Sequence, residues 1–215
     1  MHYKRSELNL PKERLSWSAV SLWKSNKDAF RSKYYEGIEQ PTSEEMIFGK
    51  KIARYLEKND PSLAHVPRYS VPEFRIEVEI QGVPMLGFLD SFDPVQAKFK
   101  EMKTGRVHWD RVRVAKHGQL PLYMSLIRAK CGFYHPYTEL VWLETARKKS
   151  VEVFGGMELV GDRGEIYLTG KVETFTRRIA KWELRLIETD VRKVAEEVSE
   201  DFTQWQNSIN IKATG

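Results

Sequence analysis

Hydrophobic and charged residues alternate strictly just after Pro72, and this period of two is the feature that most restricts the possible folds. The apolar members are Phe74, Ile76, Val78 and Ile80, and the polar members are Arg75, Glu77, Glu79 and Gln81. Successive side chains of a β-strand point to opposite faces, so this pattern is typical of a strand with one buried face. The chain is therefore expected to build a sheet that is covered on at least one side.

Two further strands are predicted directly after the first. Gln81-Gly82 predicts a turn into a strand over residues 83–90, and Asp93-Pro94 precedes a third strand over residues 95–103. Short strands that follow one another through tight turns usually pair with their neighbours in the chain. An antiparallel meander is the expected arrangement.

Other regions show helical spacing or further strand patterns. Helices are predicted over residues 16–36, from Pro41-Thr42 to about residue 60, from just before Pro121 to Gly132, and from about residue 180 to 205. Strands are predicted over residues 139–144, 165–168 and 171–175. Helices that alternate with strands in this way predict a mixed α/β (α+β) fold, with a central sheet flanked by helices.

Length and composition narrow the class of protein. The chain has 215 residues, which suits a single domain over residues 1–215, with a core over about 16–205 and peripheral or flexible ends at 1–15 and 206–215. Its single cysteine, Cys131, excludes a cysteine-ligated iron–sulfur cluster and favours a reducing, cytoplasmic location. No stretch approaches the ~18 apolar residues of a membrane helix. The formal net charge of +5 is compatible with a polyanionic partner.

Acidic and basic residues that could act together lie at the ends of the predicted strands. Glu101 and Lys103 are two apart, so they share a face of the third strand, and antiparallel pairing can bring Asp90 beside Glu101. Two carboxylates suit Mg²⁺ or Mn²⁺, and a neighbouring lysine can stabilise charge on a phosphoryl oxygen. Gln119 and Tyr123 are four apart on one helix face and could orient that lysine or a phosphate.

Each of these residues also has a structural interpretation. A Glu-x-Lys pair on a strand is usually a solvated ion pair, and Asp90 could be a turn residue. Gln119 and Tyr123 could be a polar cap and a core residue. The order and spacing of all five favour a common site.

With these motifs in that order, the chain resembles the PD-(D/E)XK nuclease superfamily, specifically its RecB-like branch. The resemblance rests on three motifs, which are Gly87-x-x-Asp90, Glu101-x-Lys103-Thr104-Gly105 and Gln119-x-x-x-Tyr123. It extends to Ser16-Trp17-Ser18, Tyr34-Tyr35-Glu36-Gly37, Trp109 and Phe175-Thr176-Arg177. It implies a restriction-endonuclease-like core with extra helices at both ends.

The resemblance assigns roles residue by residue. It implies that Asp90, Glu101 and the backbone carbonyl of Met102 bind the metal, that Lys103 is the catalytic cation, and that Gln119 and Tyr123 support it. The residues expected to contact DNA are Lys50, Lys51, Arg54, Thr104, Trp109, Arg111, Arg113 and Lys116. Further basic residues of the first helix, namely Lys24, Lys27, Arg31 and Lys33, could line the same groove.

One position departs from the pattern of the family. Relatives usually carry a His or Glu four residues after a glycine in the second predicted helix, whereas Gly49 is followed by Ala53 here. Glu57, one turn further along, could replace that ligand, and Glu45 is a weaker candidate. The alternative is that Glu57 is a surface carboxylate and that more water, or a weaker site, holds the metal.

The sequence therefore predicts a Mg²⁺- or Mn²⁺-dependent DNA nuclease, an exonuclease or a single-strand-directed enzyme of DNA repair or recombination, in a bacterial or phage-type setting. The alternatives are a DNA-binding module that has lost efficient catalysis and a nuclease acting on branched DNA or RNA. The resemblance also implies a helicase or strand-annealing partner. The sequence does not specify the oligomeric state, polarity or strand preference.

Overall fold

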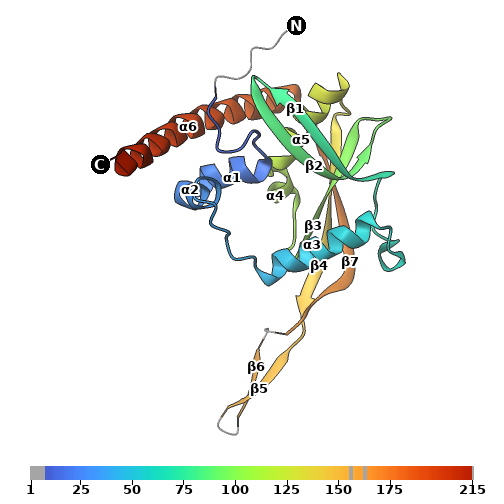
Figure 1. Cartoon of the computed structure of the whole chain (residues 1–215). Helices are drawn as coiled ribbons and strands as arrows, with labels where there is room; N and C mark the ends of the chain where they lie inside the picture. The colour runs from blue at the N-terminus through green and yellow to red at the C-terminus, as the bar shows by residue number, and fades with distance from the viewer. Residues whose placement is uncertain (1–7, 155–156, 162–163, 215) are drawn as a thin grey trace.

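The computed structural model describes residues 8–154, 157–161 and 164–214, and a five-stranded mixed sheet forms its centre (Figure 1). The strands are β1 (Val71–Ile80), β2 (Val83–Asp93), β3 (Lys98–Gly105), β4 (Tyr137–Arg147) and β7 (Ile166–Arg178), in the order β1-β2-β3-β4-β7. β3 and β4 are parallel, and the other neighbours are antiparallel. This arrangement confirms the predicted mixed sheet flanked by helices.

The predicted meander is present, but its two halves differ in length. β1 and β2 pair from Ile80↔Val83 to Val71↔Phe92 across the Gln81-Gly82 turn, where both residues have positive φ angles. β2 and β3 pair over only three positions, of which the last is Ser91↔Lys100. The third strand begins at Lys98 rather than at residue 95 because Asp93 accepts hydrogen bonds from the backbone of Val95 and Gln96 in a turn.

Helices cover both faces of the sheet. α1 (Trp17–Ser25), α5 (Gln119–Cys131) and α6 (Lys181–Thr214) pack with most of the buried apolar side chains in one large cluster. α3 (Glu44–Glu57) and the short η1 (Pro61–Leu63) form a smaller cluster on the other face, in which Ile52 and Leu56 contact Val141 and Leu143 of β4. The alternation along β4 supplies both clusters, since Leu140 and Trp142 belong to the large one.

The helix expected over residues 16–36 is divided in two. Asn26 has an extended backbone, ends α1 and caps α2 (Lys27–Tyr34) by accepting a hydrogen bond from the Ala29 amide. α3 starts at Glu44, slightly later than predicted, because Ser43 rather than Thr42 is the N-cap. α5 ends at Gly132 as predicted, with a left-handed φ of 80°.

The second half of the chain differs more from the sequence prediction. The two strands expected over 165–168 and 171–175 are one strand, β7, because Gly170 adopts a φ of 90° in a bulge that shifts the register against β4. A separate hairpin of β5 (Ser150–Phe154) and β6 (Met157–Gly161), which was not predicted, projects from the end of β4 (Figure 1). The basic stretch before α5 contains a short helix, α4 (Arg111–Ala115).

The N-terminal end of the described chain packs against the core more closely than expected, whereas the C-terminal end continues a helix with exposed residues at 207–211. Leu15 is 2% exposed and pairs with Met85 of β2, and Leu8 and Leu10 pack against the large core cluster. α6 continues past residue 205 to Thr214. None of the helices described here combines the length and the apolar character needed to cross a bilayer.

Candidate active site

The three chemistry-bearing strand residues lie where β2 and β3 separate. The ladder between these strands stops at Ser91↔Lys100, so Asp90 and Glu101 are the next residues on each strand. The Met102 amide donates a hydrogen bond of 2.7 Å to Asp90 Oδ2. The predicted antiparallel approach of Asp90 to Glu101 is therefore confirmed.

Lys103 is held from two directions. Its Nζ donates to Glu101 Oε1 at 2.6 Å and to Gln119 Oε1 at 3.0 Å. Glu101 is 3% exposed and Gln119 is also buried, whereas the Lys103 side chain is partly open to solvent. The ammonium group consequently has a defined position while one side remains accessible to a ligand.

Gly87 explains why α5 can approach this part of the sheet so closely. A Cβ atom at this position would lie 2.7 Å from Leu126 Cδ1 and 3.3 Å from Tyr123 Cε1. Because Gly87 has no side chain, α5 packs directly against β2, the strand that carries Asp90. Tyr123 is buried there, and its ring centroid is 5.8 Å from that of Phe99.

Burial makes the two carboxylates unusually hard to ionise. The pKa of Asp90 is raised to about 8, first by burial and then by the negative charge of Glu101, against the opposing effects of the Met102 amide and Lys103. Burial also raises the pKa of Glu101, although Lys103 and Gln119 oppose the increase. Within the described residues, Glu101 Oε2 is buried and has no hydrogen-bond partner.

These properties fit a divalent cation. A buried carboxylate oxygen without a partner beside a second, partly buried carboxylate is costly, and a bound cation would compensate both. Hard oxygen ligands are those that Mg²⁺ and Mn²⁺ prefer. The described residues do not, however, bring three His, Cys, Asp or Glu side chains together in a group that could hold a metal ion. Asp90 and Glu101 are thus the two side-chain candidates, and a backbone carbonyl or water would complete the ligand set.

α3 forms the opposite wall of a pocket of about 460 Å³ that contains this site. Gly49 brings the helix close to β3, because a Cβ there would lie 3.1 Å from Thr104 Oγ1. Ala53 lines the same pocket as Asp90 and Glu101, as do Lys50 and Thr104. Ala53, at the helix position where members of the family that the chain resembles carry a His or Glu, therefore lines the site but offers no ligand atom.

Glu57, the predicted replacement ligand, is exposed and lies one turn away from Ala53 on α3. Its carboxylate interacts with Glu73 of β1. It is not among the residues that line the pocket, whereas Glu45 is. Glu57 as a direct metal ligand stays a prediction that this geometry does not favour.

Glu73 is an acidic residue near the site that the sequence did not single out. The flanking pairs Pro72↔Ser91 and Phe74↔Leu89 place it opposite Asp90, and its φ of 44° is rare for a residue other than glycine. The pKa of Glu73 is raised by partial burial and by the charges of Glu57 and Asp90. The sequence feature that could have pointed to Glu73 is its position directly before Phe74, where the alternating pattern begins.

His117 was also left out of the predicted site. Its ring lies edge-on between Trp17 and Trp109, with centroid distances of 6.2 Å and 5.1 Å. Burial and the nearby charge of Lys103 lower its pKa to about 4, so the imidazole is neutral near pH 7. His117 interacts with Gln119, and its Nε2 atom has no partner among the described residues. His117 therefore helps to position Gln119, which in turn positions Lys103.

The residues predicted to contact DNA fall into different environments. Lys50, Lys51 and Arg54 are exposed on α3, Thr104 is half-buried in the pocket wall, and Arg111, Arg113 and Lys116 are exposed on or beside α4. The prediction that Trp109 contacts DNA is not supported. Its side chain is only 8% exposed and packs in the core, with the Arg113 guanidinium 4.1 Å above its ring. This burial does not favour stacking of a base on its ring, although Trp109 lines a surface hollow with Arg113 and Lys116.

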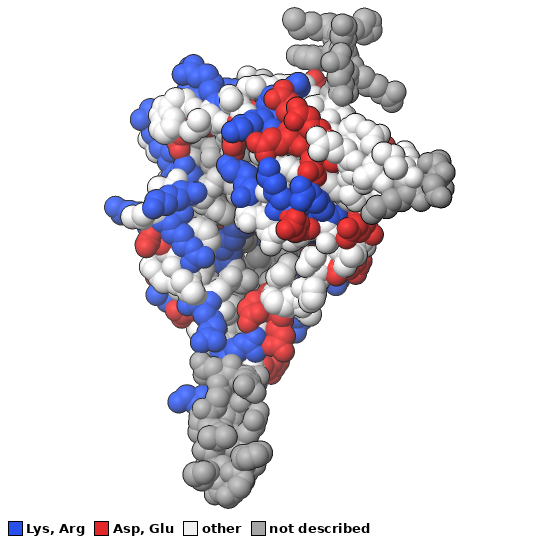
Figure 2. Space-filling model, turned by 90° about the vertical axis from the view of Figure 1, so that its left-hand side faces the viewer, with Lys and Arg blue, Asp and Glu red and all other residues white. Residues whose placement is uncertain are grey.

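Three of the four basic residues expected to extend this groove from the first helix pair with α6 instead. Lys24 contacts Asp190 at 2.6 Å, Lys27 contacts Glu197 at 3.0 Å, and Arg31 contacts Asp201 at 2.6 Å. On one face of the molecule, basic side chains gather on the left of the view, while acidic ones lie mainly to the right, interleaved with basic groups (Figure 2). Part of the basic surplus is thus neutralised within the fold.

Comparison with known proteins identifies the fold. A scan against protein-family models and a search of curated proteins found no match. Among solved structures, a putative exonuclease from Eubacterium rectale is 10% identical, with a TM-score of 0.57, and the match covers 92% of this chain and 87% of that one.

Two further structures match at similar levels. A phage-related exonuclease from Haemophilus somnus 129PT is 12% identical, with coverage of 90% and 86% and a TM-score of 0.51. LHK-Exo, solved in complex with dAMP, is 11% identical, with coverage of 93% and 95% and a TM-score of 0.50. The chain shares the fold of these exonucleases, in agreement with the PD-(D/E)XK expectation, while the RecB-like branch stays a prediction.

Proposed function

We propose that this chain is a divalent-metal-dependent DNA nuclease, acting as an exonuclease or on single strands in DNA repair or recombination. The observation that carries the proposal is the buried Glu101 Oε2 beside Asp90, which has no hydrogen-bond partner in the described part of the chain, while the Lys103 ammonium lies 2.6 Å from the other Glu101 oxygen. Two carboxylates that can hold a metal ion, together with a positioned cation, can promote hydrolysis of a phosphodiester. The fold shared with exonucleases supports the same reaction class.

Each side chain has a distinct part in this mechanism. Asp90 and Glu101 would hold the cation, Mg²⁺ or Mn²⁺, with the Met102 carbonyl as the further candidate ligand. When bound, that ion supplies Lewis-acid charge and lowers the pKa of a coordinated water. Lys103 would donate a hydrogen bond to a non-bridging phosphoryl oxygen, where negative charge increases as a water oxygen bonds to phosphorus. The bond to the leaving oxygen then breaks, and that oxygen takes up a proton from solvent while the attacking water loses one to solvent.

Gln119 and Tyr123 act through these groups. Gln119 accepts a hydrogen bond from Lys103 and thereby fixes the direction of its remaining N–H groups. Tyr123 packs behind Glu101, and burial together with the Glu101 charge raises its pKa, so its hydroxyl stays protonated. Tyr123 is therefore a positioning residue and not a base.

Labelled single- and double-stranded DNA provide the direct test. Wild-type protein is expected to release nucleotides or short fragments with Mg²⁺ or Mn²⁺ and to lose that activity in EDTA. Glu101→Gln, which keeps the shape of the side chain, serves as the inactive reference. Cleavage that persists at the wild-type rate in EDTA would exclude the proposed use of a metal.

A DNA-binding module without efficient catalysis is the second candidate function. Ala53 is the observation that favours it, since a methyl group faces the pocket in place of a ligand. This candidate predicts salt-sensitive DNA binding without turnover.

Ala53→Glu distinguishes the two candidates. We expect the variant to bind Mn²⁺ about tenfold more tightly, equivalent to ~1.4 kcal/mol of binding free energy, because a third carboxylate enters the pocket. Calorimetric titration with Mn²⁺ measures the affinity, and a cleavage assay at limiting Mn²⁺ measures the rate. A wild type that is inactive beside an active Ala53→Glu variant would favour the binding module. Ala53→Gln is the uncharged control and is expected to leave the Mn²⁺ affinity near that of the wild type.

A further inference from the structure

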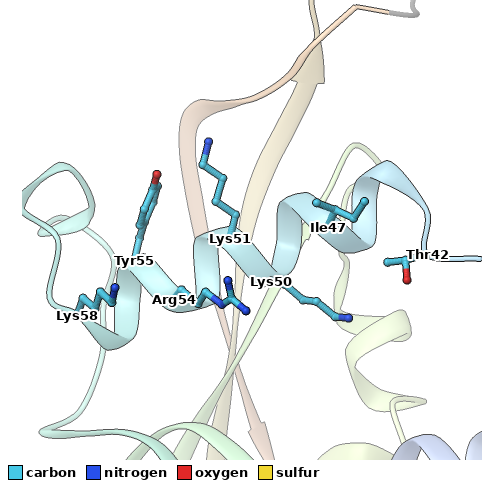
Figure 3. A pocket seen from close by; sticks show the side chains of 7 residues that line it. All are labelled: Thr42, Ile47, Lys50, Lys51, Arg54, Tyr55 and Lys58. Carbon is cyan, nitrogen blue, oxygen red and sulfur yellow. The ribbon is translucent and has the colours of Figure 1, made fainter.

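An exposed row of basic residues follows α3 away from the candidate active site. Lys50, Arg54 and Lys58 are spaced four apart, so they lie on one face of the helix and span about 12 Å. Ile47, Lys51 and Tyr55 form a second row with the same spacing. Figure 3 shows these side chains along one stretch of the helix, where they and Thr42 line a hollow of about 550 Å³.

The basic side chains of both rows are exposed to a ligand. Among the described carboxylates, none forms an ion pair with Lys50, Lys51, Arg54 or Lys58, and all four side chains are exposed. The acidic residues at the start of α3, Glu44 and Glu45, are instead paired with Arg147. Lys24, Lys27 and Arg31 form direct ion pairs with α6, whereas among the described residues the α3 cations have only longer-range partners, Glu73 for Arg54 and Glu165 for Lys51.

The second row supplies apolar and aromatic surface. Ile47 is 57% exposed, and Tyr55 is 37% exposed with Lys51 Nζ 5.8 Å from its ring centroid. Such groups gain little from a duplex, whose base faces are stacked on one another. An unpaired strand, by contrast, presents base faces that can pack against a ring while its phosphates meet the cations.

The two rows lead into the catalytic pocket. Lys50 lines both the hollow on α3 and the pocket that contains Asp90, Glu101 and Lys103. A strand bound along Lys58, Arg54 and Lys50 would therefore bring its next phosphates to the wall of that pocket.

We propose that this face of α3 binds an unpaired DNA strand and guides it to the active site. The proposal rests on the nuclease function proposed above and specifies its substrate as single-stranded DNA or a single-stranded end. Lys50, Arg54 and Lys58 contact successive phosphates, and Tyr55 packs against a base.

Binding can be measured without cleavage by fluorescence anisotropy in EDTA, in a Lys103→Ala background. The probes are a labelled oligo(dT) of about 20 nucleotides, its duplex with oligo(dA), and an oligo(rU) of equal length. The triple variant Lys50→Gln, Arg54→Gln, Lys58→Gln is expected to bind oligo(dT) at least about tenfold more weakly, and its log–log salt slope should fall by about 2. Tyr55→Ala should weaken oligo(dT) binding about tenfold but leave duplex binding nearly unchanged, and Tyr55→Phe should restore it.

The matched control replaces three exposed basic residues elsewhere, Lys130, Lys181 and Arg185, with glutamine. Thermal unfolding verifies that every variant is folded. Equal losses in the control and the α3 variant, or unchanged oligo(dT) binding by the α3 variant, would overturn the proposal even if the wild type cleaves DNA. Tighter binding of oligo(rU) than of oligo(dT) would overturn the assignment to DNA. A wild type that neither binds nor cleaves any DNA would instead remove the proposed function itself.

Discussion

Lys103→Ala is expected to slow DNA cleavage by ~10²–10³-fold, the usual effect of removing one positioned donor from a site of charge development. The reason is the fixed place of the ammonium, which two buried side chains hold at 2.6 Å and 3.0 Å. Single-turnover assays with saturating protein measure this step without the contribution of binding. Affinity for DNA is expected to change little, because the basic row on α3 is untouched.

Lys98→Ala is a matched control, since Lys98 lies on the same strand, β3, but contacts the ring of Tyr69 at 5.1 Å instead of the site. Lys103→Arg tests geometry, because a planar guanidinium cannot reproduce the contacts of a compact ammonium and should recover only part of the rate. A Lys103→Ala variant as fast as Lys98→Ala would refute the role given to the ammonium group.

Asp90→Asn is expected to abolish cleavage and, in the absence of metal, to stabilise the protein at pH 8 by about 2 kcal/mol or more. Folding raises the pKa of Asp90 from 3.8 to about 8, so the folded state binds the proton more tightly than the unfolded state does. This contribution is fully present below the unfolded pKa and is lost as the pH rises from about 4 through 8. Asparagine removes the charge, yet its carbonyl oxygen can still accept from the Met102 amide.

Thermal unfolding in EDTA at pH 5 and pH 8 measures this effect. At pH 8 the variant should have a larger free energy of unfolding than the wild type. At pH 5 this difference should be smaller, because Asp90 of the wild type is then protonated in the folded state. Asp93→Asn is the control, since Asp93 caps a turn through its side chain and asparagine can do the same. A variant that is less stable than the wild type at pH 8 would contradict the raised pKa.

The residues that carry the proposed chemistry were predictable because their relations are local. Glu101 and Lys103 share a face through the strand period, and Gln119 and Tyr123 share one through the helix period. Asp90 required only that two consecutive strands pair. The structure brings all five together around the end of the β2–β3 ladder.

Features that depend on distant contacts were not predictable in the same way. Glu73 joins the acidic group only because β1 places it opposite Asp90, and the α1 and α2 cations are neutralised by a helix more than 160 residues away in the chain. Local exceptions to the patterns also led to wrong predictions. Gly170 was interpreted as the break between two strands, but it forms a bulge within the single strand β7. Asn26 ended one helix and capped the next, although the apolar spacing continued across it.

The three-pair ladder between β2 and β3 has a consequence for the folding of the site. Asp90 belongs to the β1–β2 hairpin, which can form from neighbouring residues, whereas Glu101 and Lys103 belong to a unit that needs the α5 crossover to align β3 with β4. Pairs close in sequence form early, and parallel pairs close a longer loop. We therefore expect the active centre to be complete only once β3 is aligned with both β2 and β4, so that an intact metal site would report this alignment during refolding.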